Sequence, residues 1–194
     1  MQRITALWHD SPLKLVSALF VLSLAAMMAV ASGASFTSTT ANAGNVVTAG
    51  NLSHTNSKAP GAILNVSGLT PGDSDSGTVD LTNTGGAAGV FTLSRSALVN
   101  SDTANPLGAK LDLVVEDLGD PAAAVPPAPV VKYTGKLGPM SAVALGTWAS
   151  GETHRYKFTV TFPDGGTPAG PTSGDNAYKG DRVSVTYDWE SVSN

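Results

Sequence analysis

An uninterrupted alternation of apolar and polar side chains near the end of the chain constrains its fold most strongly. In residues 182–191, RVSVTYDWES, one face of an extended strand carries Val183, Val185, Tyr187 and Trp189, and the other face is polar. Successive side chains of a β-strand point to opposite faces, so this period of two predicts a strand with one buried and one solvated face. We therefore expect an antiparallel sheet that covers a core on one side.

Shorter runs of the same kind recur along the chain, separated by clusters of Gly, Pro, Ser, Thr and Asn about every ten residues. This spacing predicts an all-β chain that folds as an antiparallel β-sandwich or a β-barrel, with residues 35–194 forming a single domain. The expected strands are Ser35–Thr40, Asn45–Ala49, Ala62–Ser67, Gly77–Thr82, Val90–Ser96, Lys110–Asp117, Val130–Tyr133, Thr153–Phe162 and Arg182–Ser191.

The alternation also predicts which side chains face the core. In Thr153–Phe162 the expected inward residues are Tyr156, Phe158, Val160 and Phe162, and in Lys110–Asp117 they are Leu111, Leu113 and Val115. Asn83–Gly89, the proline-rich Gly119–Pro129 and Pro163–Gly174 are expected to be loops, because proline lacks the N–H that a central strand needs. Pro139–Leu145 is expected to hold a short helix.

The first 34 residues have the three parts of a secretion signal. The basic residues Arg3 and Lys14 precede an apolar run over Leu15–Val30, and small residues follow the run. We expect a signal helix that a signal peptidase removes between Ala34 and Ser35, with Ala31 as the second choice. An uncleaved anchor is the alternative, since the run approaches the length of the shortest spanning helices. The expected location is therefore secreted, extracellular or at the cell surface, with membrane contact only through an uncleaved signal segment.

The composition narrows the possible partners and bound groups. The chain carries 11 Lys and Arg against 15 Asp and Glu, scattered without a basic stripe. Nucleic-acid binding is not expected, because neutralising phosphates requires clustered cations. The chain contains no cysteine, which excludes structural sites built on thiolates and leaves stability to packing, hydrogen bonds or partner subunits.

No motif for catalysis emerges from the sequence. The histidines are His9, His54 and His154, and no HExxH pair for a zinc peptidase is present. Glu152 and His154 share one strand face and are interpreted as a solvated strand start, with a metal or acid–base pair as the alternative. Asp73 and Asp75 in PGDSDSG do not fit a calcium loop and are interpreted as a polar turn, with weak Ca²⁺ binding as the alternative. We expect no enzyme activity, no cofactor and no catalytic or metal-binding residue.

Several short motifs, taken in order behind the signal, resemble the TasA/camelysin family of biofilm-fibre and cell-surface proteins. They are Ala34-Ser35-Phe36, Thr48–Leu52 (TAGNL), Leu69–Asp73 (LTPGD), Leu81–Gly85 (LTNTG), and Asn176–Gly180 (NAYKG) followed by Val183–Trp189. The resemblance covers Ala34–Gly85 and Asn176–Ser191. The middle of the chain shares with the family only a pattern of short alternating strands. The chain departs from the family because it lacks a Lys-rich middle and contains the proline-rich segment Gly119–Pro129.

The resemblance implies a jelly-roll-like β-sandwich, removal of the signal by a dedicated peptidase, and polymerisation of the chain with itself. In such fibres the freed N-terminus of one subunit adds as a strand to the next. The donor strand implied here is short, β-prone and nearly uncharged, and consists of Ser35, Phe36, Thr37, Ser38, Thr39 and Thr40. A frayed tail or an intramolecular edge strand is the alternative for these residues.

The expected function is a secreted structural subunit of an extracellular or surface fibre. The first alternative is a monomeric surface adhesin or ligand-binding β-sandwich, with Gly119–Pro129 and Pro163–Gly174 as its contact surface. A secreted metallopeptidase, a description applied to some members of the family, is the least favoured.

Overall fold

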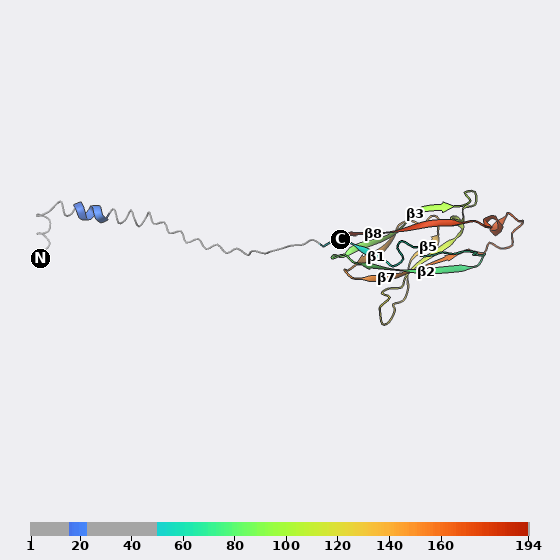
Figure 1. Cartoon of the computed structure of the whole chain (residues 1–194), viewed down its shortest axis with the longest axis horizontal. Coiled ribbons are helices and arrows are strands. Elements are labelled where there is room, and N and C mark those ends of the chain that lie inside the picture. The colour runs from blue at the N-terminus through green and yellow to red at the C-terminus, as the bar shows by residue number, and fades with distance from the viewer. Residues whose placement is uncertain (1–15, 23–49, 194) are drawn as a thin grey trace, which may run out of the picture. The chain divides into compact units, whose positions relative to one another are not determined.

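Two antiparallel sheets face each other in the computed structural model, which describes residues 16–22 and 50–193 of the chain (Figure 1). The chain divides into two units, Met1–Val47 and Thr48–Asn194, and the strands that the structure describes belong to the second. The strands are β1 (His54–Asn56), β2 (Ser74–Asn83), β3 (Gly89–Asn100), β4 (Asp112–Asp117), β5 (Val130–Lys136), β6 (Val143–Trp148), β7 (Thr153–Thr161) and β8 (Val183–Ser193). Two short helices, α2 (Leu107–Lys110) and the 3-10 helix η2 (Gly174–Tyr178), complete the described elements of this unit.

The order of the strands differs from their order in the chain. The five-stranded sheet is arranged β1-β2-β7-β4-β5, and the three-stranded sheet is arranged β6-β3-β8. All pairs are antiparallel. The outer strands are therefore β1 and β5 in one sheet and β6 and β8 in the other. On one side of the sandwich β5 and β6 approach each other, whereas on the opposite side no strand among the described residues pairs with the outer edge of β8.

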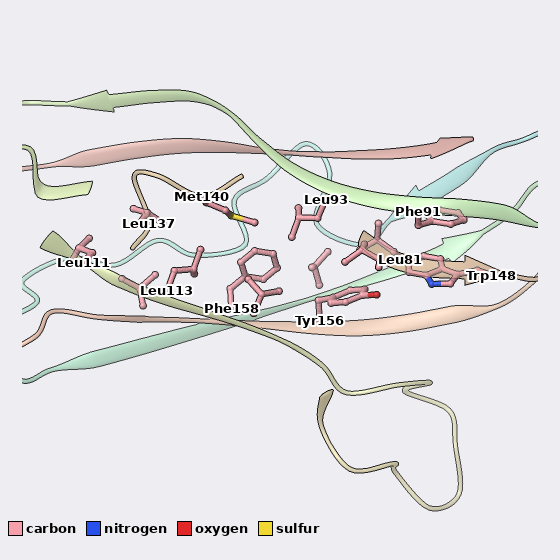
Figure 2. Close-up of a cluster of buried hydrophobic side chains, with 14 of the residues drawn as sticks. Leu81, Phe91, Leu93, Leu111, Leu113, Leu137, Met140, Trp148, Tyr156 and Phe158 are labelled. Carbon is pink, nitrogen blue, oxygen red and sulfur yellow. The ribbon is translucent and has the colours of Figure 1, made fainter. Parts of the chain in front are cut away.

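The core lies between the two sheets and is built by the alternation that the sequence predicts (Figure 2). In β7 the buried side chains are Tyr156, Phe158 and Val160, and in β4 Leu113 and Val115 are buried between half-buried neighbours. Burying each large apolar side chain contributes about 1.5–3 kcal/mol. The fully buried residues with the largest side chains are Trp148, Tyr156, Phe91, Phe158, Leu81, Leu93, Leu113, Val79 and Val115.

The predicted all-β sandwich is confirmed. Strands occur at Gly77–Thr82, Val90–Ser96, Lys110–Asp117, Val130–Tyr133, Thr153–Phe162 and Arg182–Ser191, with ends that differ by a few residues. In β8 the side chains alternate between half-buried and exposed, with Tyr187 and Trp189 on the inner face as predicted. Gly119–Pro129 and residues 163–173 form loops, and the loop 118–129 projects away from the sandwich (Figure 1).

Two predictions within the described residues are wrong. Ala62–Ser67 forms no strand, although Ile63 and Leu64 pack against the core. Pro139–Leu145 forms no helix; its second half belongs to strand β6, which pairs with β3. Pairing with β3 and the burial of Leu145 outweigh the weak local helix preference of this segment.

Other predictions concern residues that the structure does not describe. The predicted strands Ser35–Thr40 and Asn45–Ala49 and the cut between Ala34 and Ser35 lie outside the described residues. Of the predicted signal segment, residues 16–22 are described and are helical.

Candidate functional site

A cluster of ionisable side chains surrounds His154 at one end of the core. His154 lies near the start of β7 on the same side as Tyr156, and its ring stacks on that of Trp148 with centroids 4.6 Å apart. Its Nδ1 lies 3.0 Å from Asp117 Oδ1, and its Nε2 lies 3.0 Å from Glu152 Oε1. The imidazole therefore bridges two carboxylates, one at the end of β4 and one just before β7.

Asp117 is the buried member of this cluster. Its side chain is only 7% exposed. Oδ1 accepts a hydrogen bond from the Gly119 backbone N–H at 2.9 Å, and Oδ2 lies 3.5 Å from Lys132 Nζ. The Tyr156 hydroxyl lies 3.5 Å from the same Oδ2. A buried carboxylate with these neighbours is stabilised in its ionised form.

The contacts shift the pKa values of all three central groups. The hydrogen bond to Asp117 raises the pKa of His154 above 6.5, against the opposing effect of burial, and Glu152 adds to the rise. Burial opposes ionisation of Asp117, but hydrogen bonds from His154 and Gly119 outweigh it and lower its pKa. The pKa of Glu152 is lowered in the same way by His154 and by the Ala149 N–H, against burial. The stable arrangement is an imidazolium between two carboxylates.

This geometry suits a structural ion cluster rather than a reactive centre. Both ring nitrogens of His154 face carboxylate oxygens, so neither offers a lone pair to a metal or a substrate proton. Within residues 16–22 and 50–193, no group of three or more His, Asp or Glu side chains is placed to hold a metal ion. The cluster instead joins β4, β7 and the base of the loop 118–129.

Sequence reasoning paired His154 with Glu152 but missed Asp117. The contact between Glu152 and His154 is present, and its surroundings are half-buried rather than fully solvated. The sequence did contain an indication for Asp117, because it lies two positions after Val115 and four after Leu113. These three residues share one face of β4, and all three are buried. An acidic residue at a core-facing position requires a partner within the fold, and His154 is that partner.

The aspartates of PGDSDSG have separate local roles. Asp73 Oδ2 accepts a hydrogen bond from the Thr70 N–H at 3.0 Å, which fixes the turn before β2. Asp75 lies within β2, and its Oδ1 accepts a hydrogen bond from the Ser76 N–H at 2.7 Å. The polar turn is thus present around Asp73, while Asp75 belongs to the strand.

The outer edge of β8 is the second candidate site. β8 spans Val183–Ser193 and, within residues 50–193, pairs with β3 and with no strand on its other side. Near its end, Ser191 Oγ lies 3.3 Å from His54 Nδ1 of β1, which covers that end of the strand. A strand with one unpaired side presents a row of N–H and C=O groups on which a further strand can pair.

Comparisons with known proteins found no matching family model and no match among curated proteins. The described part of the chain holds no helix with the length and apolar character needed to cross a membrane.

Proposed function

We propose that this protein is a secreted structural subunit of an extracellular or cell-surface fibre. In this proposal the signal segment 1–34 is removed and Ser35–Thr40 of one subunit adds as a strand to the next. A jelly-roll-like connection of the two sheets and polymerisation of the chain with itself, both implied by the resemblance to the TasA/camelysin family, are parts of the same proposal.

The free edge of β8 is the observation that carries the proposal. The strand is long and contains no Pro or Lys, the residues that most often protect an edge from pairing, and its charged side chains are Asp188 and Glu190. The other edges are less suitable acceptors. β1 has only 3 residues, β6 carries Gly146 with φ of +121°, and β5 lies close to β6 and bears Lys132 and Lys136.

Strand addition at this edge would produce an open polymer. The donor Ser35–Thr40 and the acceptor β8 are different surfaces of the same chain, so the contact is head-to-tail. A head-to-tail contact that does not close on itself repeats without limit and yields a filament. The backbone hydrogen bonds would provide the attachment, and Phe36 is the one large apolar side chain of the donor.

Electron microscopy of four proteins tests this function. The mature protein beginning at Ser35 is expected to form filaments, and deletion of Ser35–Thr40 is expected to leave folded single particles. Phe36→Ser should weaken assembly strongly, whereas the matched control Thr39→Ser should assemble like the mature protein. Single particles at every concentration tested, or filaments from the deletion variant, would contradict the proposal.

A monomeric adhesin or ligand-binding sandwich remains the second candidate, and one observation favours it. The loop 118–129 is rich in Pro and Ala, and Val125 within it is 82% exposed. Exposed apolar surface of this kind is often a contact site. If the mature protein forms no filaments but adheres to cell surfaces, and if Val125→Ser abolishes this adhesion, the result would favour the adhesin function instead.

A further inference from the structure

Residues 62–69 cross the inner surface of β2. They include Ala62–Ser67, the predicted strand that the fold does not contain. A Cβ added to Gly77 would lie 2.0 Å from the backbone oxygen of Ile63 and 3.3 Å from Leu64 Cδ2. Gly77 has the same parity as the buried Val79 and Leu81, so this approach is on the core side of β2. Only glycine permits the backbone of another segment to pass this closely.

The registers of the strands place this segment beside the free edge of β8. Gly77 pairs with Phe158 on β7. The Phe158 ring contacts those of Tyr187 and Trp189 on β8, with centroids 4.7 and 6.1 Å apart. The space above Gly77 is therefore the next position in the three-stranded sheet beyond β8, on the side away from β3.

The segment also runs in the direction that a neighbouring antiparallel strand would take. It passes from Ile63, opposite Gly77, to the turn before β2, where the Gly72 N–H bonds to the Phe162 carbonyl at 2.7 Å. β8 runs the opposite way, from Val183, close to Gly108, to Trp189, whose ring packs against that of Tyr156.

Side-chain packing holds the segment in this place, without a ladder of backbone hydrogen bonds. Ile63, Leu64 and Leu69 pack against the core. Among the described residues, no backbone–backbone hydrogen bond joins 62–69 to β8. On the inner face of β8, the Tyr187 hydroxyl oxygen and Trp189 Nε1 are buried, and neither has a hydrogen-bond partner among the described residues. The position is therefore filled by side-chain packing, without the backbone hydrogen bonds of a strand pair.

We propose that the segment 62–69 is a placeholder that a second copy of this chain displaces. This inference rests on the proposed function and extends it to the site of docking. The incoming strand Ser35–Thr40 takes the fourth position of the three-stranded sheet, pairs with β8, and lays Phe36 over Gly77 where Leu64 now packs. The hydroxyl-rich donor also brings acceptors within reach of the buried Trp189 N–H. Displacement of the placeholder then limits the rate at which fibres grow.

Assembly kinetics of the mature protein provide the first test. Leu64→Ser weakens the packing of the placeholder and is expected to speed filament growth about tenfold, because 1.4 kcal/mol corresponds to a factor of ten. Asn65→Ser, at an exposed neighbouring position, should grow at the wild-type rate. Equal rates for both variants, or slower growth of Leu64→Ser with an unchanged circular dichroism spectrum, would overturn the inference.

Amide hydrogen exchange of monomer and filament provides the second test and does not depend on a variant. In the filament, alternate amides of Val183–Trp189 should become protected, and the apolar side chains of 62–69 should become accessible to oxidative footprinting. Filaments in which β8 and 62–69 behave as in the monomer would refute the placeholder and leave the fibre function standing. Absence of any filament from the protein beginning at Ser35 would instead refute the function itself.

Discussion

His154 Nδ1 lies 3.0 Å from Asp117 Oδ1, and this contact links β7 to its neighbour β4 at the end of the core. The pKa of His154 is raised above 6.5, first by this hydrogen bond. Folded and unfolded protein therefore bind protons differently, and stability depends on pH. The contribution of His154 is fully present below the unfolded pKa and is lost as the pH rises through the folded pKa.

We expect the melting temperature to fall as the pH rises above 6.5, the ordinary pKa of histidine. The lowered pKa values of Asp117 and Glu152 act in the other direction, and their contribution is lost as the pH falls below the carboxylate range. Thermal melts between these limits measure both effects. In His154→Asn the loss on the alkaline side should be absent; an unchanged alkaline slope would assign the effect to another group.

Asp117→Asn should destabilise the fold by about 2 kcal/mol, because it leaves the imidazolium without its buried counter-charge. Asp112→Asn is the matched control on the same strand, since its carboxylate is 43% exposed and pairs with Lys136 at the surface. The control should change the free energy of unfolding by less than about 0.5 kcal/mol. Urea unfolding of both variants provides the measurement, and equal effects would contradict the role assigned to Asp117.

Trp148→Ala is expected to cost about 3–5 kcal/mol. The indole is 1% exposed and stacks on Phe91 with ring centroids 3.9 Å apart, as well as on His154. Val99→Ala, at a side chain that is 62% exposed, should change stability by less than about 0.5 kcal/mol. A Trp148→Ala protein that melts with the wild type would show that this end of the core does not contribute to stability.

Asn83 is the buried polar residue whose loss should be felt most widely. Its Nδ2 donates to the carbonyls of Ala87, Trp148 and Ala149, and its Oδ1 accepts from the Gly85 N–H. Asn83→Asp replaces the donor Nδ2 with a second carboxylate oxygen, which would face the three carbonyl oxygens, and should destabilise the protein by about 2–3 kcal/mol. Calorimetry of this variant and of Thr84→Ala, at an exposed position, provides the measurement. If Asn83→Asp lowers the stability by no more than the control does, the hydrogen bonds of Asn83 do not contribute as proposed.

The alternating pattern predicted the strands well where it continued unbroken. β2, β7 and β8 keep their period of two along the inner face, and the sequence places their buried residues correctly. Trp148 escaped the same reasoning because it follows Leu145 by three positions. Gly146, with φ of +121°, and the irregular register at Phe91 and Thr92 allow both side chains to face inward. A local pattern does not carry this information.

The remaining errors have a tertiary origin. Ala62–Ser67 has strand-like composition, but the fold places it beside β8 without a ladder of hydrogen bonds, which no local propensity predicts. The cluster at His154 required knowledge that β4 and β7 are neighbours, because its members are separated in sequence by 37 residues. The order of strands in a sheet cannot be read from their individual sequences.

The resistance of β8 to a pulling force depends on the direction in which the force acts. Ser193 pairs with Gly89, and Asn51 accepts a hydrogen bond from the Gly86 N–H, so residues 51 and 193 flank the same turn between β2 and β3. Tension between these two points would peel β8 from β3 pair by pair, at low force. A load carried by a strand laid along the whole of β8 would instead be borne in shear by many hydrogen bonds at once, and the domain would resist stretching most strongly when loaded along that edge.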